Sequence, residues 1–215
     1  MRLNYYIVFL FVLLIFSQNK GQEALGQGKR EFKGPENWEL NKQEDGISIY
    51  TARQKGSHIL AYRIEAEIQG SIEEVYRQVI DFQANKKHLE TIKEIRVLEK
   101  KPNQEVLVYM LFDLPWPFRD RDFVNRMELQ VGQDTIVLNS RPVTNRIKPQ
   151  DGVVRMREFS EQWLLTSQGK DATQLSLRGH ADPGGSFPDW VINRFVVKEP
   201  LALVKGIKLQ VEHNR

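Results

Sequence analysis

The residues best placed to do chemistry lie at the start of one expected strand, within the run PWPFRDRDFV. Pro115 and Pro117 predict a bend or a sheet edge before it, because proline cannot donate a ladder hydrogen bond. From Arg121 onward the odd positions are apolar apart from Asn125, so this strand is expected to turn its odd side chains inward. Arg121 shares that parity, and an unpaired charge in an apolar interior carries a high desolvation cost.

Two interpretations of Arg121 follow. In one, the side chain snorkels to water or pairs with a nearby acid, Asp113, Asp120 or Asp122. In the other, the interior is a cavity and the guanidinium binds a ligand oxygen or phosphate, a task that suits its planar fork of donors. The sequence leaves both open.

Other catalytic signals are missing. The chain has no G-x-S-x-G, P-loop or G-x-G-x-x-G motif, and its four histidines are scattered. Zero cysteines exclude disulfides, thiolate zinc sites and cysteine nucleophiles. Asp120 and Asp122 are flanked by Arg119 and Arg121, which are expected to pair with them before a metal does. We therefore expect no cofactor, no metal and no catalytic residues.

The elements that must position Arg121 are mostly strands, because segments of period two alternate with turn signals. Asp45-Gly46 is a strong hairpin signal between the first two strands. The expected strands are 38–44, 47–53, 60–68, 92–100, 105–112, 123–131, 135–140, 155–165 and 173–181.

Two helices are expected. Ser71 and Glu74 form a capping-box pair before a helix that ends near Asp81. A second pair, Ser186 and Asp189, predicts a long helix over 187–211, which Pro200 is expected to kink. Runs of strands with a segregated long helix predict an α+β fold with an antiparallel sheet.

The composition narrows the function classes. The chain of 215 residues carries a net charge of +3, and two of these charges, Arg2 and Lys20, lie in the first 21 residues. The remaining body is nearly neutral, so we expect no nucleic-acid partner, since such binding neutralises many phosphates.

The N-terminal residues have the pattern of a targeting sequence. Twelve apolar or aromatic residues, 5–16, follow one positive charge, which suits a signal-peptide core and is short for a spanning helix of about 20 residues. We expect a signal peptide over 1–21, a Gly- and Gln-rich linker over 22–35 and one domain over 36–215, hence an exported protein. An uncleaved anchor is the alternative.

The sequence resembles the START domain, the lipid-transfer domain named after steroidogenic acute regulatory protein. Three segments carry the resemblance: IKEIRVLEK with the strand after it (92–112), WPFRDRDFV (116–124) and ADPGGSFPDWVIN (181–193). The resemblance covers roughly 36–211 and implies a helix-grip fold, in which a curved antiparallel sheet wraps an apolar tunnel under a C-terminal lid helix.

The resemblance also implies a function: binding of one sterol, phospholipid or similar lipid, and its transfer between membranes. Arg121 matches the family arginine that can face the cavity, and the kink at Pro200 resembles phospholipid-transfer members. Met110 lies where sterol-carrying members have an acid, so no sterol preference is implied.

The expected ligand contacts share the inward parity or flank it, and the alternative is that they are ordinary core residues. They are Arg121, Tyr109, Met110, Val108, Phe123, Asn125, Met127, Leu175 and Leu177, with Val191 and Phe195 from the lid.

Transfer requires opening, for which the loops 141–152 and 182–186 are the expected gates. Arg141, Arg146 and Lys148 are candidates for transient contact with a membrane surface. The protein is expected to act as a monomer.

Two alternative functions remain. One is a polyketide cyclase or aromatase that polarises a carbonyl with Arg121, Tyr109 and Asn125. The other is an interaction protein with a filled interior, whose lid helix docks a partner.

Overall fold

The computed structural model describes residues 32, 34–144, 146–148 and 150–214. The predicted signal peptide (1–21) and almost all of the predicted linker lie outside these residues, so both stay predictions. No helix among the described residues is long and apolar enough to cross a membrane.

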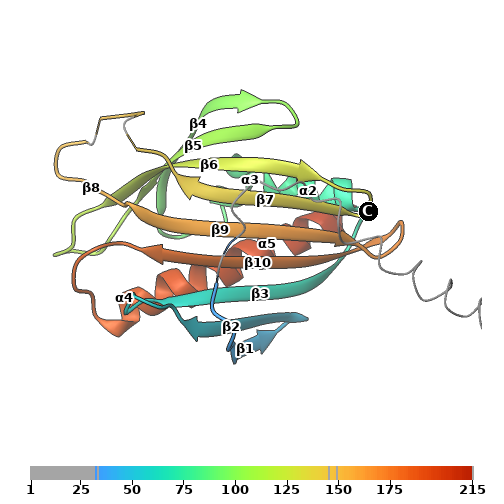
Figure 1. The fold of residues 1–215 in the computed structure, drawn as a ribbon, viewed down its shortest axis with the longest axis horizontal. Helices are drawn as coiled ribbons and strands as arrows, with labels where there is room; N and C mark the ends of the chain where they lie inside the picture. The colour runs from blue at the N-terminus through green and yellow to red at the C-terminus, as the bar shows by residue number, and fades with distance from the viewer. Residues whose placement is uncertain (1–31, 33, 145, 149, 215) are drawn as a thin grey trace, which may run out of the picture. The chain divides into compact units, whose positions relative to one another are not determined.

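One curved sheet dominates the described part of the chain (Figure 1). Its strand order is β1-β2-β3-β10-β9-β7-β6-β5-β4, with every neighbour on this path antiparallel, and β8 adds to β6 in parallel. The strands are β1 (Glu39–Glu44), β2 (Ile47–Arg53), β3 (Leu60–Gln69), β4 (Ile92–Lys101), β5 (Glu105–Phe112), β6 (Arg121–Val131), β7 (Thr135–Pro142), β8 (Val154–Arg155), β9 (Glu158–Ser167) and β10 (Ala172–Asp182).

The predicted hairpin between the first two strands is confirmed. Asp45 and Gly46 both have positive φ, 49° and 73°, which suits the tight turns that join twisted antiparallel strands. The predicted single strand over 155–165 is wrong in one respect, because it is two strands, β8 and β9, separated at Met156.

The first helical region contains two helices rather than one. Helix α2 (Ile72–Val79) begins at Ser71 with the predicted capping box, in which the Ser71 hydroxyl accepts from the Glu74 amide and the Glu74 carboxylate accepts from the Ser71 amide. The short α3 (Phe82–Lys86) follows and was not predicted; its N-cap Asp81 accepts from the amide of Ala84.

The C-terminal helix differs from the prediction at its start and at its middle. Helix α4 (Asp189–Asn193) has Pro188 at its N-cap with no side-chain cap, so the expected Ser186–Asp189 pair does not form. A π-helical turn, η1 (Arg194–Lys198), then leads into α5 (Glu199–His213), which holds Pro200 in its first turn.

Proline explains the π-helical turn. Pro200 has no amide hydrogen and its ring clashes with the carbonyl four residues back, so a regular helix cannot continue through it. The Glu199 amide donates instead to the carbonyl of Arg194, five residues back. The predicted irregularity at Pro200 is thus a widened turn.

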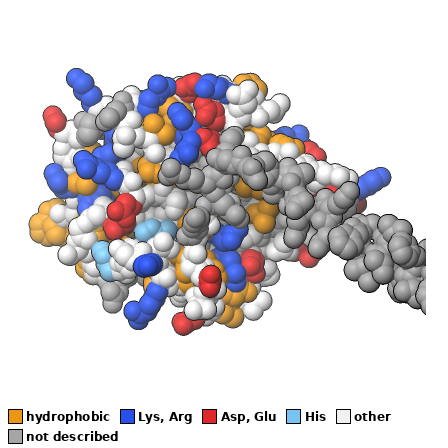
Figure 2. Space-filling view, in the orientation of Figure 1, with side chains coloured by type: hydrophobic (Ala, Val, Ile, Leu, Met, Phe, Trp, Pro, Cys, Tyr) orange, Lys and Arg blue, Asp and Glu red, His pale blue; other side chains and the backbone are white. Residues whose placement is uncertain are grey.

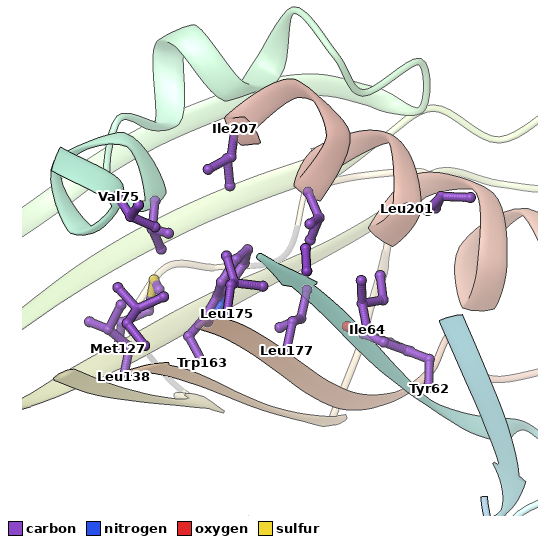
Figure 3. Packing of buried hydrophobic residues seen from close by; sticks show 14 of the residues in the cluster. Tyr62, Ile64, Val75, Met127, Leu138, Trp163, Leu175, Leu177, Leu201 and Ile207 are labelled. Atoms are coloured by element: carbon purple, nitrogen blue, oxygen red, sulfur yellow. The ribbon is translucent and has the colours of Figure 1, made fainter. Parts of the chain in front are cut away.

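The main core lies between the concave face of the sheet and the helices α2 and α5 (Figure 3). Val75 of α2 and Ile207 of α5 face Leu138, Trp163 and Leu175 across this core, and all five are buried. The predicted α+β arrangement, with helices on one side of an antiparallel sheet, is confirmed.

Candidate functional site

An apolar cavity of about 140 Å³ lies between the sheet and the C-terminal helical segment. Side chains from β3, β4, β5, β6, β9 and β10 form its sheet side, α2 and α3 contribute further side chains, and Phe195, Pro200 and Leu203 close it from η1 and α5. Most of its surface is carbon, as in pockets for apolar ligands.

Five of the predicted contacts line this cavity: Met110, Phe123, Asn125, Met127 and Phe195. Four of them lie on the neighbouring strands β5 and β6, where Met110 pairs with Phe123, and Phe195 lies in η1. Inward parity on β6 therefore brings Phe123, Asn125 and Met127 to the cavity.

The aromatic rings form one connected wall. The Phe123 ring stacks on Phe112 and Phe159, with centroids 5.4 Å and 4.7 Å away, and Phe112 meets Phe195 of η1 edge-on at 5.8 Å. These contacts join the sheet to the lid, so displacement of η1 would break an aromatic pair.

Four other predicted contacts lie deeper in the core and do not line the cavity. Val108, Leu175 and Leu177 are fully buried in the main hydrophobic cluster, and Val191 is buried in α4. Their parity is inward, but alternation does not say where along the strand the packing leaves space.

Tyr109 does not line the cavity, contrary to the prediction. It lies on the opposite face of β5, in a second cluster with Leu107, Leu111 and Val124. Its hydroxyl accepts a hydrogen bond from Gln150 Nε2 at 2.9 Å, and burial raises its pKa. The reason is period two, because 109 has the opposite parity to 108 and 110.

Arg121 is buried, and its hydrogen bonds go to the backbone rather than to Asp113, Asp120 or Asp122. Its Nε donates to the carbonyl of Pro183 at 2.7 Å, Nη1 to that of Arg119 at 2.7 Å and Nη2 to that of Gly184 at 2.9 Å. Its guanidinium also stacks on Phe187, 5.0 Å from the ring centroid. Arg121 therefore fastens the segment between β10 and α4 to β6, and it is not among the cavity-lining residues.

These placements separate the three residues proposed for a cyclase. Asn125 lines the cavity, Tyr109 lies on the other face of the sheet, and Arg121 is held by backbone carbonyls. The structure does not bring them together.

The polar centre of the cavity is a group that the sequence analysis missed. Glu161 of β9 lines the cavity, where its Oε1 accepts from the Tyr62 hydroxyl at 2.7 Å and its Oε2 accepts from Trp163 Nε1 at 3.0 Å. Burial raises the pKa of Glu161, and the two donors oppose that rise. Burial and the neighbouring carboxylate hold the pKa of Tyr62 well above its usual value, so its hydroxyl stays a donor.

A glycine makes this hydrogen bond possible. Gly179 of β10 lies opposite Tyr62 on one side and Glu161 on the other. A Cβ at Gly179 would come within 3.0 Å of the Tyr62 ring and hydroxyl, so the ring lies across the backbone where only glycine leaves room. The signal was present in the sequence, because Glu161 shares the inward parity of Trp163 and Leu165.

Two further acceptors belong to the lining. Oδ1 of Asn125 is buried without a hydrogen-bond partner in the described structure, and Oε2 of Glu199 is buried beside Thr91 without a hydrogen bond of good geometry. Burial raises the pKa of Glu199. No Lys, Arg or His is among the described side chains that line the cavity.

Among the described residues, no group of three or more His, Asp or Glu side chains is placed to bind a metal. On the face shown in Figure 2, described Lys and Arg side chains lie among Asp and Glu side chains.

Comparison with known proteins identifies related chains. The START domain model matches residues 29–213. The uncharacterized protein PA1579 of Pseudomonas aeruginosa is 29% identical over 178 residues, which cover 82% of this chain and 88% of that protein. Bovine phosphatidylcholine transfer protein is 27% identical over 184 residues, 83% of this chain and 85% of its own.

A solved structure agrees with the fold. The STAR-related lipid transfer protein (fragment 25–204) from Xanthomonas axonopodis superposes with a TM-score of 0.73 at 25% identity, covering 82% of this chain and 99% of that fragment. The expected helix-grip fold is confirmed by this match together with the ten-stranded sheet and its C-terminal helix.

Proposed function

Because the chain belongs to the START domain family, we propose that it binds one lipid molecule between the sheet and the C-terminal helical segment and transfers it between membranes. The observation that carries the proposal is the apolar cavity closed by η1 and α5, in a chain similar to phosphatidylcholine transfer protein. A carrier of this design requires the C-terminal helical segment to move when lipid enters.

The size of the cavity sets a requirement. Pockets for small ligands measure about 300–1,000 Å³, whereas this cavity measures about 140 Å³. A lipid therefore enters only if the walls move. Met110, Met127 and Met156 line the cavity, and their unbranched side chains repack easily.

The lid is the other movable wall. Phe195, Pro200 and Leu203 enter the cavity from η1 and α5. The π-helical turn interrupts the α-helical hydrogen bonds, and we propose that the lid moves at this turn.

Membrane contact is proposed at one end of the molecule. Trp116, in the β5–β6 connection, is 93% exposed, and Trp190, in α4, is 56% exposed. Phe118 and Phe187 bring these two segments together, with ring centroids 4.9 Å apart. Exposed tryptophans favour the membrane–water interface.

The basic loop is a weaker candidate for this contact. Arg141 pairs with Glu128, and Arg146 pairs with Glu99 at 2.8 Å. Two of its three predicted cations are thus engaged within the chain.

Lipid binding is tested by filling the cavity. Ala181 lines it, whereas Ala172 lies near the start of the same strand and does not. Delipidated protein should take up one fluorescent phospholipid per chain, Ala181→Phe should abolish uptake, and Ala172→Phe should retain it with an unchanged circular dichroism spectrum. Wild-type protein that takes up no lipid, and carries none by mass spectrometry, would refute the proposal.

Transfer is tested separately from binding. Trp116→Ala combined with Trp190→Ala should slow lipid transfer between donor and acceptor vesicles while leaving binding in solution unchanged. Leu209→Ala, at an equally exposed position on α5, should leave both unchanged. An unchanged transfer rate in the double variant would contradict the tryptophan contact.

We further propose that residues 1–21 direct export and that the mature protein is a monomer. N-terminal sequencing of protein from the producing cell should begin after residue 21, and light scattering should give the mass of one chain. An intact Met1 in the mature protein would contradict cleavage.

A further inference from the structure

We propose that the polar end of the bound lipid is a hydrogen-bond donor, an amine, ammonium or hydroxyl group, that Glu161 accepts, and that lipids with an anionic head are disfavoured. The inference rests on the proposed lipid-binding function and specifies its ligand class.

The first argument is the position of Glu161. It stands in a cross-strand row with Gly179 and Tyr62, and its carboxyl lines the cavity. An ionised carboxylate has about four acceptor sites, and the protein occupies two of them through Tyr62 and Trp163. Both donors hold the carboxyl in one orientation, and acceptor capacity remains on each oxygen.

The second argument is that other polar atoms of the lining are hydrogen-bond acceptors. Asn125 Oδ1 and Glu199 Oε2 are buried acceptors without a hydrogen bond of good geometry, in the cavity that Glu161 lines. Buried acceptors without donors are costly, so a ligand that supplies donors gains free energy here.

The third argument is the lack of a counter-charge for an anion. The described lining has no Lys, Arg or His. Arg121, the predicted cationic anchor, donates to three backbone carbonyls outside the lining. A phosphate monoester or a fatty-acid carboxylate placed against Glu161 would therefore meet acceptors and like charge, which is unfavourable in an apolar site.

The raised pKa of Glu161 agrees with this geometry, because burial disfavours its charge and a donor or cation from the ligand would offset that cost. The Tyr62 proton is directed at Glu161 Oε1, so Tyr62 offers no free donor to an anionic head group.

The test is a displacement assay on the protein with a neutral fluorescent probe, N-phenyl-1-naphthylamine, and three competitors of equal chain length: a long-chain amine, a long-chain alcohol and a fatty acid. We expect the amine and the alcohol to displace the probe at concentrations about tenfold or more below that of the fatty acid. One hydrogen bond to a charged group accounts for a difference in affinity of this size. A fatty acid as potent as the amine would overturn the inference.

Variants assign the preference to Glu161. In the Glu161→Gln variant, the concentrations at which the three competitors displace the probe should lie within about threefold of one another. Glu158→Gln, at an exposed position on the same strand, should keep the wild-type order. If Glu161→Gln does not fold, Asn125→Leu, which removes a second acceptor, should weaken the preference in the same direction.

The failures are distinguishable. If neither the probe nor any lipid binds to the protein, the proposed function itself is contradicted. A probe that binds and is displaced without regard to the head group contradicts only the assignment of Glu161. Displacement by both amine and alcohol supports donor recognition, and displacement by the amine alone supports recognition of a cation.

Discussion

Gly179→Ala tests the geometry of the cross-strand row formed by Tyr62, Gly179 and Glu161. The Tyr62 ring crosses β10 at Gly179, and a methyl group there would come within 3.0 Å of its Cζ and hydroxyl oxygen. Backbone hydrogen bonds fix both strands, so the ring must move rather than the sheet.

The magnitude follows from that movement. Restoring ordinary contact requires a shift of the ring of roughly 1 Å, which would stretch the 2.7 Å bond from Tyr62 to Glu161 beyond hydrogen-bonding distance. A lost hydrogen bond to a charged group costs about 1.5–3 kcal/mol, and overpacking adds about 1–3 kcal/mol. Replacing a strand glycine returns about 0.5–1 kcal/mol, so we expect a net loss of about 3 kcal/mol.

The assay is thermal and denaturant unfolding of a double-mutant cycle. A loss of about 3 kcal/mol should lower Tm by about 6–12 °C in a domain of this size. In the Tyr62→Val background the ring is absent, so Gly179→Ala should cost less than about 1 kcal/mol or stabilise the fold. An equal cost in both backgrounds would refute the argument, because it would show that the methyl group clashes with something other than Tyr62.

Three further predictions concern residues around this site. Asp122 is fully buried and binds Arg155 through both carboxylate oxygens, so Asp122→Asn should cost about 3–5 kcal/mol by urea unfolding; a cost below 1 kcal/mol would contradict it. Arg121→Lys replaces a planar fork of three nitrogens with one compact ammonium that does not span the same three carbonyls, so hydrogen–deuterium exchange over 184–187 should accelerate while that of β3 stays unchanged. Burial lowers the pKa of His180 below its ordinary 6.5, so the unfolded chain binds the proton more tightly and stability falls as pH drops through 6.5. His180→Gln should reduce the change of Tm with pH between pH 7.5 and 5.5. An unchanged dependence of Tm on pH would show that other groups determine it.

Local patterns predicted most of the fold because each pattern has a local cause. The hairpin at Asp45–Gly46 needs positive φ, and the capping box at Ser71 needs two orphan amides, so neither depends on distant residues. The C-terminal helix was harder. Its start lacks a side-chain cap. Pro200 predicts an irregularity, but no local pattern says that it takes the form of a π-helical turn.

The site was predicted in part, for a physical reason. Alternation tells which face of a strand a residue occupies, so Phe123 and Met127 were placed correctly. It does not tell whether that face meets the cavity or solid core, which is why Leu175 and Leu177 were misplaced. Nor does it tell which partners satisfy a buried charge. Arg121 is paired with loop carbonyls some 60 residues away in sequence, and those contacts exist only in the folded chain.

The reassignment of Arg121 changes how opening and ligand choice relate. Two of its hydrogen bonds, to the carbonyls of Pro183 and Gly184, and its stacking on Phe187 hold the segment that leads into the lid. In our proposal, Glu161 provides the polar contact inside the cavity. If the two roles are separate, Arg121→Lys should speed lipid exchange without altering the preference for donor heads, and Glu161→Gln should alter that preference without speeding exchange. A change in head-group preference on Arg121→Lys would show that the guanidinium reaches the ligand once the lid has moved, and the two roles would then be one.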